Sequence, residues 1–132
     1  MERPAHLGLR HLALNVRDVR MMRAFYVDVL GFRVEWEPDP DNVYLTSGRD
    51  NLALHRAEGN AEAARPGALD HLGLIVGSAG LVDAWAAYLD ERGVPLDTRP
   101  KTHRDGARSC YFRDPEGNRV QILHHPPISP LG

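Results

Sequence analysis

The chain lacks the features that mark membrane-spanning, disulfide-bonded and nucleic-acid-binding proteins. Its 132 residues include a single cysteine, Cys110, so no disulfide can form within the chain and we expect a reducing, cytoplasmic setting. No apolar run approaches the roughly 20 residues that a membrane-spanning helix needs, and residues 1–6 lack the apolar stretch of a signal peptide. The formal net charge is −2, whereas proteins that bind nucleic acids or anionic membranes present basic surfaces. We therefore expect neither a nucleic acid nor a membrane as a partner.

The remaining composition is that of one globular domain. Hydrophobic residues make up 42% of the chain and charged residues 26%, which is ordinary for a globular protein. A chain of this length buries a core without disulfides or a structural metal. We expect a single domain over residues 1–132.

A short pattern occurs twice in the chain. Residues 9–16 read Leu-Arg-His-Leu-Ala-Leu-Asn-Val, and residues 69–76 read Leu-Asp-His-Leu-Gly-Leu-Ile-Val. The two histidines, His11 and His71, lie sixty positions apart (71 − 11) at the same point of the pattern. Both segments are typical of β-strands. A histidine repeated in register on two related strands could bring two imidazoles to one site, which is the arrangement that a divalent metal ion requires.

The first half predicts one strand, one helix and three further strands. Asp18 is a suitable N-cap for the helix and Gly31 ends it. The strands are expected at about residues 7–16, 32–37, 43–46 and 51–56.

The second half repeats this order. Its helix begins at the N-cap Ser78 and ends at Gly93. The last two strands flank a tight turn at residues 114–117. The strands are expected at about residues 69–76, 94–98, 107–113 and 118–124. The fold class is therefore α+β, with two tandem β-α-β-β-β modules: module one at about 7–57, a linker at about 58–67, module two at about 68–125 and a tail at 126–132.

Two motifs accompany the repeat. One is Phe25-Tyr26 followed by Leu30-Gly31-Phe32, and the other is Phe112-Arg113-Asp114-Pro115-Glu116-Gly117-Asn118. Together with the repeated module and its histidine-bearing strands, they resemble the vicinal oxygen chelate superfamily, which includes glyoxalase I, extradiol dioxygenases and bleomycin-binding proteins. The resemblance covers about residues 7–125. It implies two curved half-barrel sheets that form a cup, with the helices outside.

The resemblance also implies a metal ion in this cup, bound by the first and last strands of each module. On this pattern the ligands are His11 and His71 from the first strands, and Gln121 at a position where the family usually has glutamate. The matching position in module one is Ala53. His55, two residues later, lies on the same face of its strand because side chains alternate, and it is the alternative ligand.

This set of ligands favours certain metals. Carboxylates normally supply the charge that hard cations such as Mg²⁺ require, and neither expected glutamate is present. Imidazoles with an amide oxygen instead suit a divalent ion of Fe, Mn, Zn, Ni or Co.

Tyr111 is the candidate catalytic residue. In extradiol dioxygenases a tyrosine ten residues before the ligand glutamate binds and polarises the substrate oxygen, and Tyr111 has this spacing from Gln121. The alternative is an aromatic side chain that packs in the sheet. The position of the dioxygenase acid–base histidine is occupied by Asn51, which cannot transfer protons in that role.

Three functions remain open from the sequence. The first is a divalent-metal-dependent enzyme, of lyase, isomerase or dioxygenase type, acting on a small substrate that chelates the metal through adjacent oxygens. The second is a metal-free small-molecule binding protein of the bleomycin-resistance type, favoured by the incomplete ligand set. The third is a dimerisation or regulatory module. The resemblance also implies a homodimer.

Overall fold

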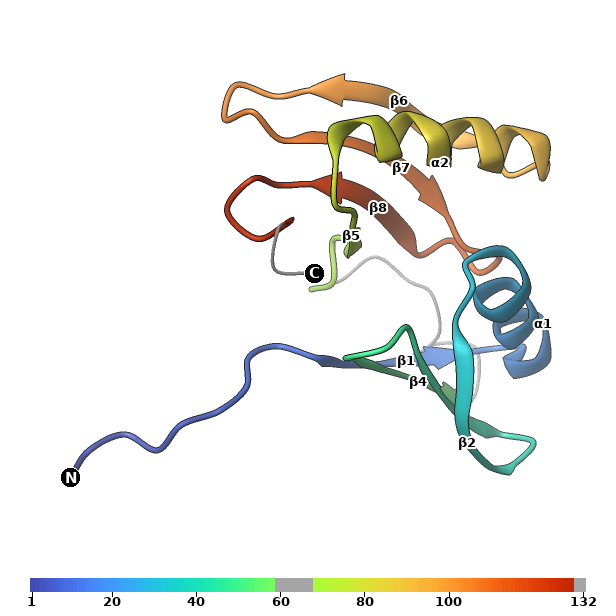
Figure 1. Cartoon of the computed structure of the whole chain (residues 1–132). Coiled ribbons are helices and arrows are strands. Elements are labelled where there is room, and N and C mark those ends of the chain that lie inside the picture. The colour runs from blue at the N-terminus through green and yellow to red at the C-terminus, as the bar shows by residue number, and fades with distance from the viewer. Residues whose placement is uncertain (59–67, 130–132) are drawn as a thin grey trace. The chain divides into compact units, whose positions relative to one another are not determined.

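The computed structural model describes residues 1–58 and 68–129 of the chain (Figure 1). It separates into two compact units, Met1–Arg65 and Pro66–Gly132, which we call module one and module two. Each contains one four-stranded mixed sheet. The expected linker after Glu58, and residues 130–132 of the expected tail, lie outside the described residues.

Module one contains four strands and one helical segment. The elements are β1 (His11–Val16), α1 (Val19–Ala24), the π-helical turn η1 (Phe25–Val29), β2 (Arg33–Asp39), β3 (Asn42–Thr46) and β4 (Asn51–Arg56). The strand order is β1-β4-β3-β2. Strands β1 and β4 run parallel, with His11 opposite Asn51, whereas β3 is antiparallel to both of its neighbours.

The predicted helix boundaries of module one are confirmed. The Asp18 carboxylate accepts a hydrogen bond from the backbone N–H of Met21 at 3.0 Å, as an N-cap does. At the other end Gly31 has a φ of 81°, a left-handed conformation that glycine adopts without strain. The buried ring of Tyr26 then packs edge-on against Phe32, with ring centroids 5.5 Å apart. The first family motif is therefore a helix-termination and packing motif.

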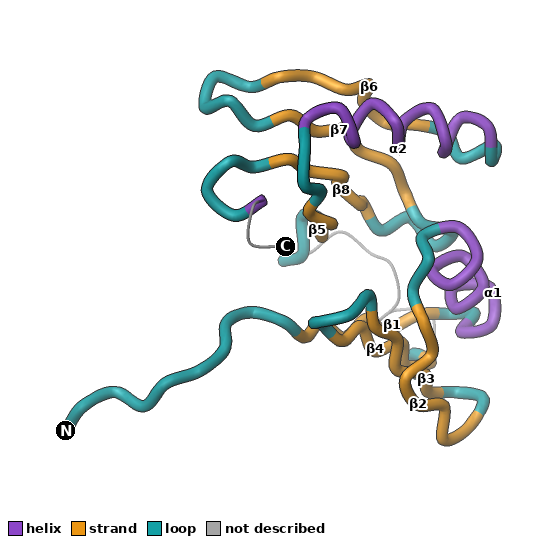
Figure 2. The backbone as a smooth tube through the Cα atoms, viewed as in Figure 1, coloured by secondary structure: helices purple, strands orange, loops and turns teal. Residues whose placement is uncertain are grey.

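Module two has the same architecture with a longer helix (Figure 2). Its elements are β5 (Leu72–Ile75), α2 (Ala79–Glu91), β6 (Leu96–Thr102), β7 (Arg108–Arg113) and β8 (Arg119–His124), with strand order β5-β8-β7-β6. Strands β5 and β8 are parallel, and the β6–β7 and β7–β8 pairs are antiparallel. Ser78 caps α2 by accepting a hydrogen bond from the Leu81 N–H, which confirms the predicted N-cap. The expected α+β fold with two repeated modules is confirmed by this topology.

The second family motif also has a structural role. Asp114 is buried in the β7–β8 turn, and its carboxylate accepts hydrogen bonds from the backbone N–H groups of Glu116 and Asn118. The Asn118 side-chain amide donates to the same carboxylate. These bonds satisfy the turn's buried polar groups. The motif therefore specifies a turn and carries no information about the reaction.

Side-chain alternation gives each sheet two distinct faces. One face packs against the module's own helix and forms its core, which in module two contains Val82, Ala86, Leu89, Cys110, Phe112, Val120 and Ile122. In module one the corresponding core residues include Leu14, Val16, Met22, Val43, Leu45, Leu52 and Leu54. We call the opposite side of each sheet its far face. The alternation places His11, Ala53 and His55 on the far face of module one, and Tyr111 and Gln121 on that of module two.

Several predicted strand boundaries are wrong. Strand β1 begins at His11 and β5 begins at Leu72, so His71 directly precedes its strand. Strand β6 covers 96–102 and not 94–98, because the backbone around Gly93, with a φ of 74°, first closes the end of α2. Strand β6 then continues through Pro100. Proline is tolerated there because β6 is an edge strand with irregular pairing. Among the described residues, no helix is long and apolar enough to cross a membrane.

Candidate functional site

His11 is held on the far face of module one by a chain of hydrogen bonds. Its Nδ1 lies 2.8 Å from Oδ1 of Asn51, and Nδ2 of Asn51 donates to Oε1 of Glu35 at 3.2 Å. A carboxylate only accepts hydrogen bonds, so the Asn51 amide must direct its nitrogen to Glu35 and its oxygen to His11. His11 therefore donates its Nδ1–H, so Nε2 is the nitrogen that has the lone pair when the ring is neutral.

His55 is held by a second chain of the same kind. Its Nδ1 lies 2.7 Å from Oδ1 of Asn42, and Nδ2 of Asn42 donates to both carboxylate oxygens of Asp39, at 3.0 and 3.2 Å. By the same reasoning His55 donates its Nδ1–H, and Nε2 has the lone pair when the ring is neutral. Module one thus has two His–Asn–carboxylate relays, and each engages Nδ1 of its histidine.

The register separates the two imidazoles of module one. His11 is opposite Asn51, and His55 lies four residues farther along β4, a distance of about 13 Å along a strand. Ala53 lies between them, fully buried, with Ala13 and Tyr44 as its strand partners. The structure therefore does not bring His11 and His55 together, and this separation disfavours a shared ion.

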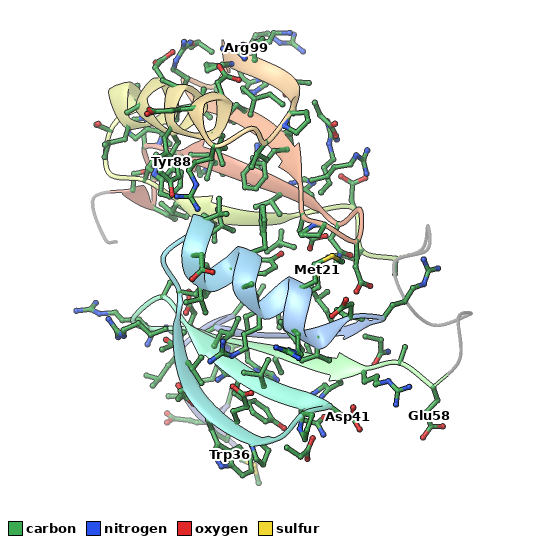
Figure 3. All side chains as sticks on the ribbon, turned by 90° about the vertical axis from the view of Figure 1, so that its right-hand side faces the viewer. Met21, Trp36, Asp41, Glu58, Tyr88 and Arg99 are labelled. Atoms are coloured by element: carbon green, nitrogen blue, oxygen red, sulfur yellow. The ribbon has the colours of Figure 1, made fainter. Side chains whose placement is uncertain are left out.

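Three rings form a row on the far face of module one. The rings of Trp36 and Tyr44 are stacked, with centroids 5.1 Å apart, and Tyr44 meets His55 edge-on at 5.6 Å. Trp36 is 60% exposed and points away from α1 (Figure 3). This row was not expected from the sequence, although the pairing of two strands with aromatic residues at alternating positions was a signal for it.

In module two, His71 bonds directly to a carboxylate. Its Nδ1 lies 2.6 Å from Oδ2 of Asp70. The hydrogen bond from His71 holds the pKa of the Asp70 carboxyl below its ordinary value, so Asp70 is ionised at neutral pH and accepts the Nδ1–H. In the neutral ring of His71, Nε2 is therefore also the nitrogen with the lone pair. The His71 ring meets the Tyr111 ring edge-on, with centroids 5.3 Å apart.

Gln121 and Tyr111 are partners across the β7–β8 hairpin. On its other side Gln121 is opposite Gly73 of β5. A Cβ atom at Gly73 would lie 3.8 Å from Oε1 of Gln121, so the glycine leaves one side of the amide uncrowded. Gln121 is only 8% exposed, and within the described residues its side chain makes no hydrogen bond. Module two thus brings His71, Tyr111 and Gln121 to one part of its far face.

Arg119 lies on the same face as Gln121, two residues earlier in β8. The carbon at the centre of its guanidinium group is 3.9 Å from the centroid of the Tyr111 ring, within the range of a cation–π interaction. Its Nε is 3.7 Å from Oδ2 of Asp97, which itself forms an ion pair of 2.9 Å with Arg113. No role for Arg119 was expected from the sequence. The available signal was its position two residues before Gln121, which places both side chains on the same face of β8.

The residues present fit a metal ion that prefers nitrogen ligands. Histidines that bind metals usually donate their other ring N–H to a carboxylate, an amide or a carbonyl group, and both His11 and His71 are held in this way. The available donors are imidazole nitrogens and the Gln121 amide oxygen, with no carboxylate at either usual glutamate position. Among the described residues, no group of three or more His, Cys, Asp or Glu side chains forms a metal site by itself.

The chain matches the family model described as the Glyoxalase/Bleomycin resistance protein/Dioxygenase superfamily over residues 8–122. It is 30% identical over 120 residues to a biphenyl-2,3-diol 1,2-dioxygenase from Rhodococcus globerulus, covering 86% of this chain and 61% of the dioxygenase. Thus the chain spans less than two thirds of that relative.

Solved structures are similar over nearly the whole chain. A lactoylglutathione lyase from Agrobacterium tumefaciens superimposes with a TM-score of 0.72 and 26% identity, covering 93% of this chain and 96% of the lyase. A glyoxalase-related enzyme from Fulvimarina pelagi has a TM-score of 0.74 at 21% identity, covering 90% and 88% of the two chains. The latter likeness is one of fold alone.

Proposed function

Because the chain belongs to the glyoxalase/bleomycin resistance protein/dioxygenase superfamily, we propose that it is a divalent-metal-dependent enzyme. Its substrate is a small molecule that chelates the metal through adjacent oxygens. The observation that supports this most is the state of His11 and His71. Both donate Nδ1–H to a hydrogen-bonded partner, as metal-binding histidines do, which makes Nε2 of the neutral ring the ligand atom.

The proposed ligands are His11, His71 and Gln121. His55 is left out of this set, because the register places it about 13 Å along the strand from the level of His11. When bound, the ion would act as a Lewis acid on the two adjacent substrate oxygens. A borderline ion such as Fe, Mn, Zn, Ni or Co suits two imidazoles and an amide better than Mg²⁺ does.

The contacts of Tyr111 and His55 indicate their roles toward the substrate. Tyr111 lies opposite Gln121 and against His71, so we assign its hydroxyl to a hydrogen bond with a substrate oxygen. Neither Ala53 nor Gln121 can accept a proton in the way a glutamate does. His55, with its basic Nε2 and its relay to Asp39, is the proposed proton acceptor on the far face of module one.

Elemental analysis of the purified, untagged protein tests the metal. We expect about one equivalent per chain, and we expect His11→Ala and His71→Ala each to lose it. His55→Ala is the matched control, since it removes an equally oriented imidazole from the same sheet as His11, and it should retain the metal. Metal content that is unchanged in the His11→Ala, His71→Ala double variant would overturn the proposal.

The second candidate is a metal-free protein that binds a small molecule. It is favoured by the absence of both glutamates and by the row of rings at Trp36, Tyr44 and His55, which offers an aromatic surface to a small molecule. Protein that stays metal-free after incubation with each of the five metals, but whose Trp36 fluorescence responds to a ligand, would support this alternative. A Trp36→Phe variant identifies the signal, because Trp85 is the only other tryptophan.

We also propose that the protein works as a cytoplasmic homodimer. The dimer is supported by the resemblance to the superfamily, and the location by the single cysteine. Light scattering on the eluting protein measures the mass directly, and a mass of 14.7 kDa would contradict the dimer.

A further inference from the structure

Arg119 has hydrogen-bond donors that the protein does not use. The side chain is 31% exposed, and the central carbon of its guanidinium group lies over the Tyr111 ring, 3.9 Å from the centroid. Within the described residues it makes no hydrogen bond, and its buried Nε has only the 3.7 Å contact with Asp97, which is too long for a hydrogen bond. Buried donors in folded proteins nearly always have an acceptor, so this nitrogen indicates that the guanidinium group can take a further acceptor.

The nearby carboxylates are engaged elsewhere. Asp97 lies 3.7 Å from Arg119 but 2.9 Å from Nε of Arg113, and Arg113 also donates to the carbonyl oxygen of Gly117. Asp70 accepts the hydrogen bond of His71, and its interaction with Arg119 is the weakest of the influences that lower its pKa. Two arginines therefore share one carboxylate, and Arg119 has the poorer geometry of the two.

We propose that Arg119 binds a carboxylate of the substrate, and that the substrate is therefore a small carboxylic acid with its acidic group close to the chelating oxygens. This inference rests on the proposed function, because Arg119 is on the same face as Gln121 and packs on the ring of Tyr111. A guanidinium group presents parallel N–H donors that match a carboxylate. The contact with the Tyr111 ring restricts the motion of the group, which lowers the entropy lost on binding.

Two matched pairs of probes test the proposal. Pyruvate and methyl pyruvate have the same adjacent oxygens, but only the first is an anion; salicylate and salicylamide form an aromatic pair of the same kind. Binding is measured by calorimetry or by ligand-observed NMR, for metal-loaded protein and for protein treated with EDTA. The variants are Arg119→Gln and Arg119→Lys, with Arg113→Gln as the control that removes the neighbouring, already paired arginine.

We expect Arg119→Gln to weaken binding of at least one acid by about tenfold or more, as loss of a charge-assisted hydrogen bond does. The affinity of Arg119→Gln for the matching neutral compound, methyl pyruvate or salicylamide, should differ from that of the wild type by less than about twofold. Arg119→Lys should keep part of the preference, since the charge remains without the parallel donors, and Arg113→Gln should keep all of it. Comparing each variant with the wild type cancels the metal's own preference for an anion.

The proposal is overturned if the wild type prefers neither acid, or if Arg119→Gln leaves both preferences unchanged. Thermal unfolding checks that the variants are folded. If Arg119→Gln is unfolded, the acid preference of Arg119→Lys is the test of the proposal. Failure of the metal proposal gives a different result: EDTA then leaves all affinities unchanged, whether or not the preference for acids depends on Arg119.

Discussion

Module one and module two place a tyrosine at the same register position, but the strand partner differs. Tyr44 is opposite Ala53, whereas Tyr111 is opposite Gln121. In module one the tyrosine is stacked with Trp36, and in module two the guanidinium group of Arg119 lies over the tyrosine ring. The same backbone position therefore supports an aromatic surface in one module and a charged, polar one in the other.

The two modules also orient their first histidines differently. His11 reaches a carboxylate through Asn51, while His71 is bonded directly to Asp70 on its own segment. The relay in module one depends on the pairing of all four strands, because β3 lies between β4 and β2, whereas the contact in module two is between neighbours in the sequence. Both arrangements engage Nδ1 of the histidine, so the two modules fix the same ring nitrogen through different partners.

The largest expected effect comes from placing glutamate at the two corresponding positions. Ala53 is fully buried beside Tyr44 and Ala13, so in metal-free protein Ala53→Glu must bury a carboxylate without a partner. We expect it to lower the free energy of unfolding by about 3 kcal/mol or more. Gln121→Glu keeps the side-chain volume next to Gly73, and it should raise Mn²⁺ affinity about tenfold or more by adding a charge to the ligands.

Urea unfolding in EDTA and calorimetric titration with Mn²⁺ measure these two effects. If Ala53→Glu and Gln121→Glu were equally stable, the difference in burial between positions 53 and 121 would not affect the free energy of unfolding. If Gln121→Glu left the affinity for Mn²⁺ unchanged, the role of Gln121 as a ligand would be wrong.

The next-largest effect is on metal affinity, and it distinguishes the His11 relay from the His55 relay in module one. Asn51→Ala removes the acceptor for Nδ1–H of His11, and we expect metal affinity to fall by about 10- to 100-fold. Asn42→Ala breaks the equivalent relay of His55 and should change metal affinity less than about twofold. Both affinities are measured by competition with a chelating indicator. A large effect of Asn42→Ala would return His55 to the ligand set.

A smaller effect compares the stability of the modules. Cys110 of β7 corresponds in register to Val43 of β3, and both are fully buried. Burial raises the pKa of the Cys110 thiol, so alkylation at neutral pH requires the strand to become exposed. A Val43→Cys, Cys110→Val double variant moves the single thiol to module one.

We expect the thiol in module one to react about fivefold faster or more, equivalent to roughly 1 kcal/mol of opening free energy. The reason is the covering helix: the helical segment of module one has 11 residues (6 + 5) and ends in a π-helical turn, whereas α2 is a regular α-helix of 13 residues. Rates of alkylation in dilute urea, followed by mass spectrometry, provide the measurement. Equal rates would mean that the two modules open as one unit.

The sequence predicted the repeat, the order of elements and the helix caps, because these depend on local patterns. Asp18, Gly31 and Ser78 act at the ends of helices through contacts within a few residues. Local patterns also explain why the two motifs identified the family but not the reaction. Tyr26 and Asp114 serve a helix end and a turn, which belong to the fold and not to the site.

The partners of the site residues could not be predicted in the same way. The relay from His11 ends at Glu35, on a strand whose pairing is interrupted by irregularities after Val34 and Trp36. Such bulges shift which residues face each other, and alternation alone does not locate them. The contact of Arg119 with Tyr111 additionally depends on the conformation of a long side chain, which no sequence pattern specifies.

The smallest expected effect concerns the ion pairs that connect the helices to the sheets. In module one Arg23 of α1 pairs with Glu37, whereas in module two the helix carries the acidic partner, Asp83 with Arg108. The hydrogen bond from Arg108 lowers the pKa of Asp83 below its unfolded value of 3.8. In acid the unfolded chain therefore binds more protons than the folded one, and the unfolding free energy falls as the pH drops through this range.

Asp83→Asn removes that contribution, so the variant should be slightly less stable than the wild type at pH 7 and lose less stability between pH 5 and pH 3. The exposed position of the pair keeps the effect small. Urea midpoints at pH 7, 5 and 3 measure it, and Arg23→Gln is the counterpart in module one. Because Asp83 is the partner with the lowered pKa, its removal should flatten the acid dependence. An acid dependence identical to that of the wild type would show that the Asp83–Arg108 pair does not contribute to holding α2 on its sheet.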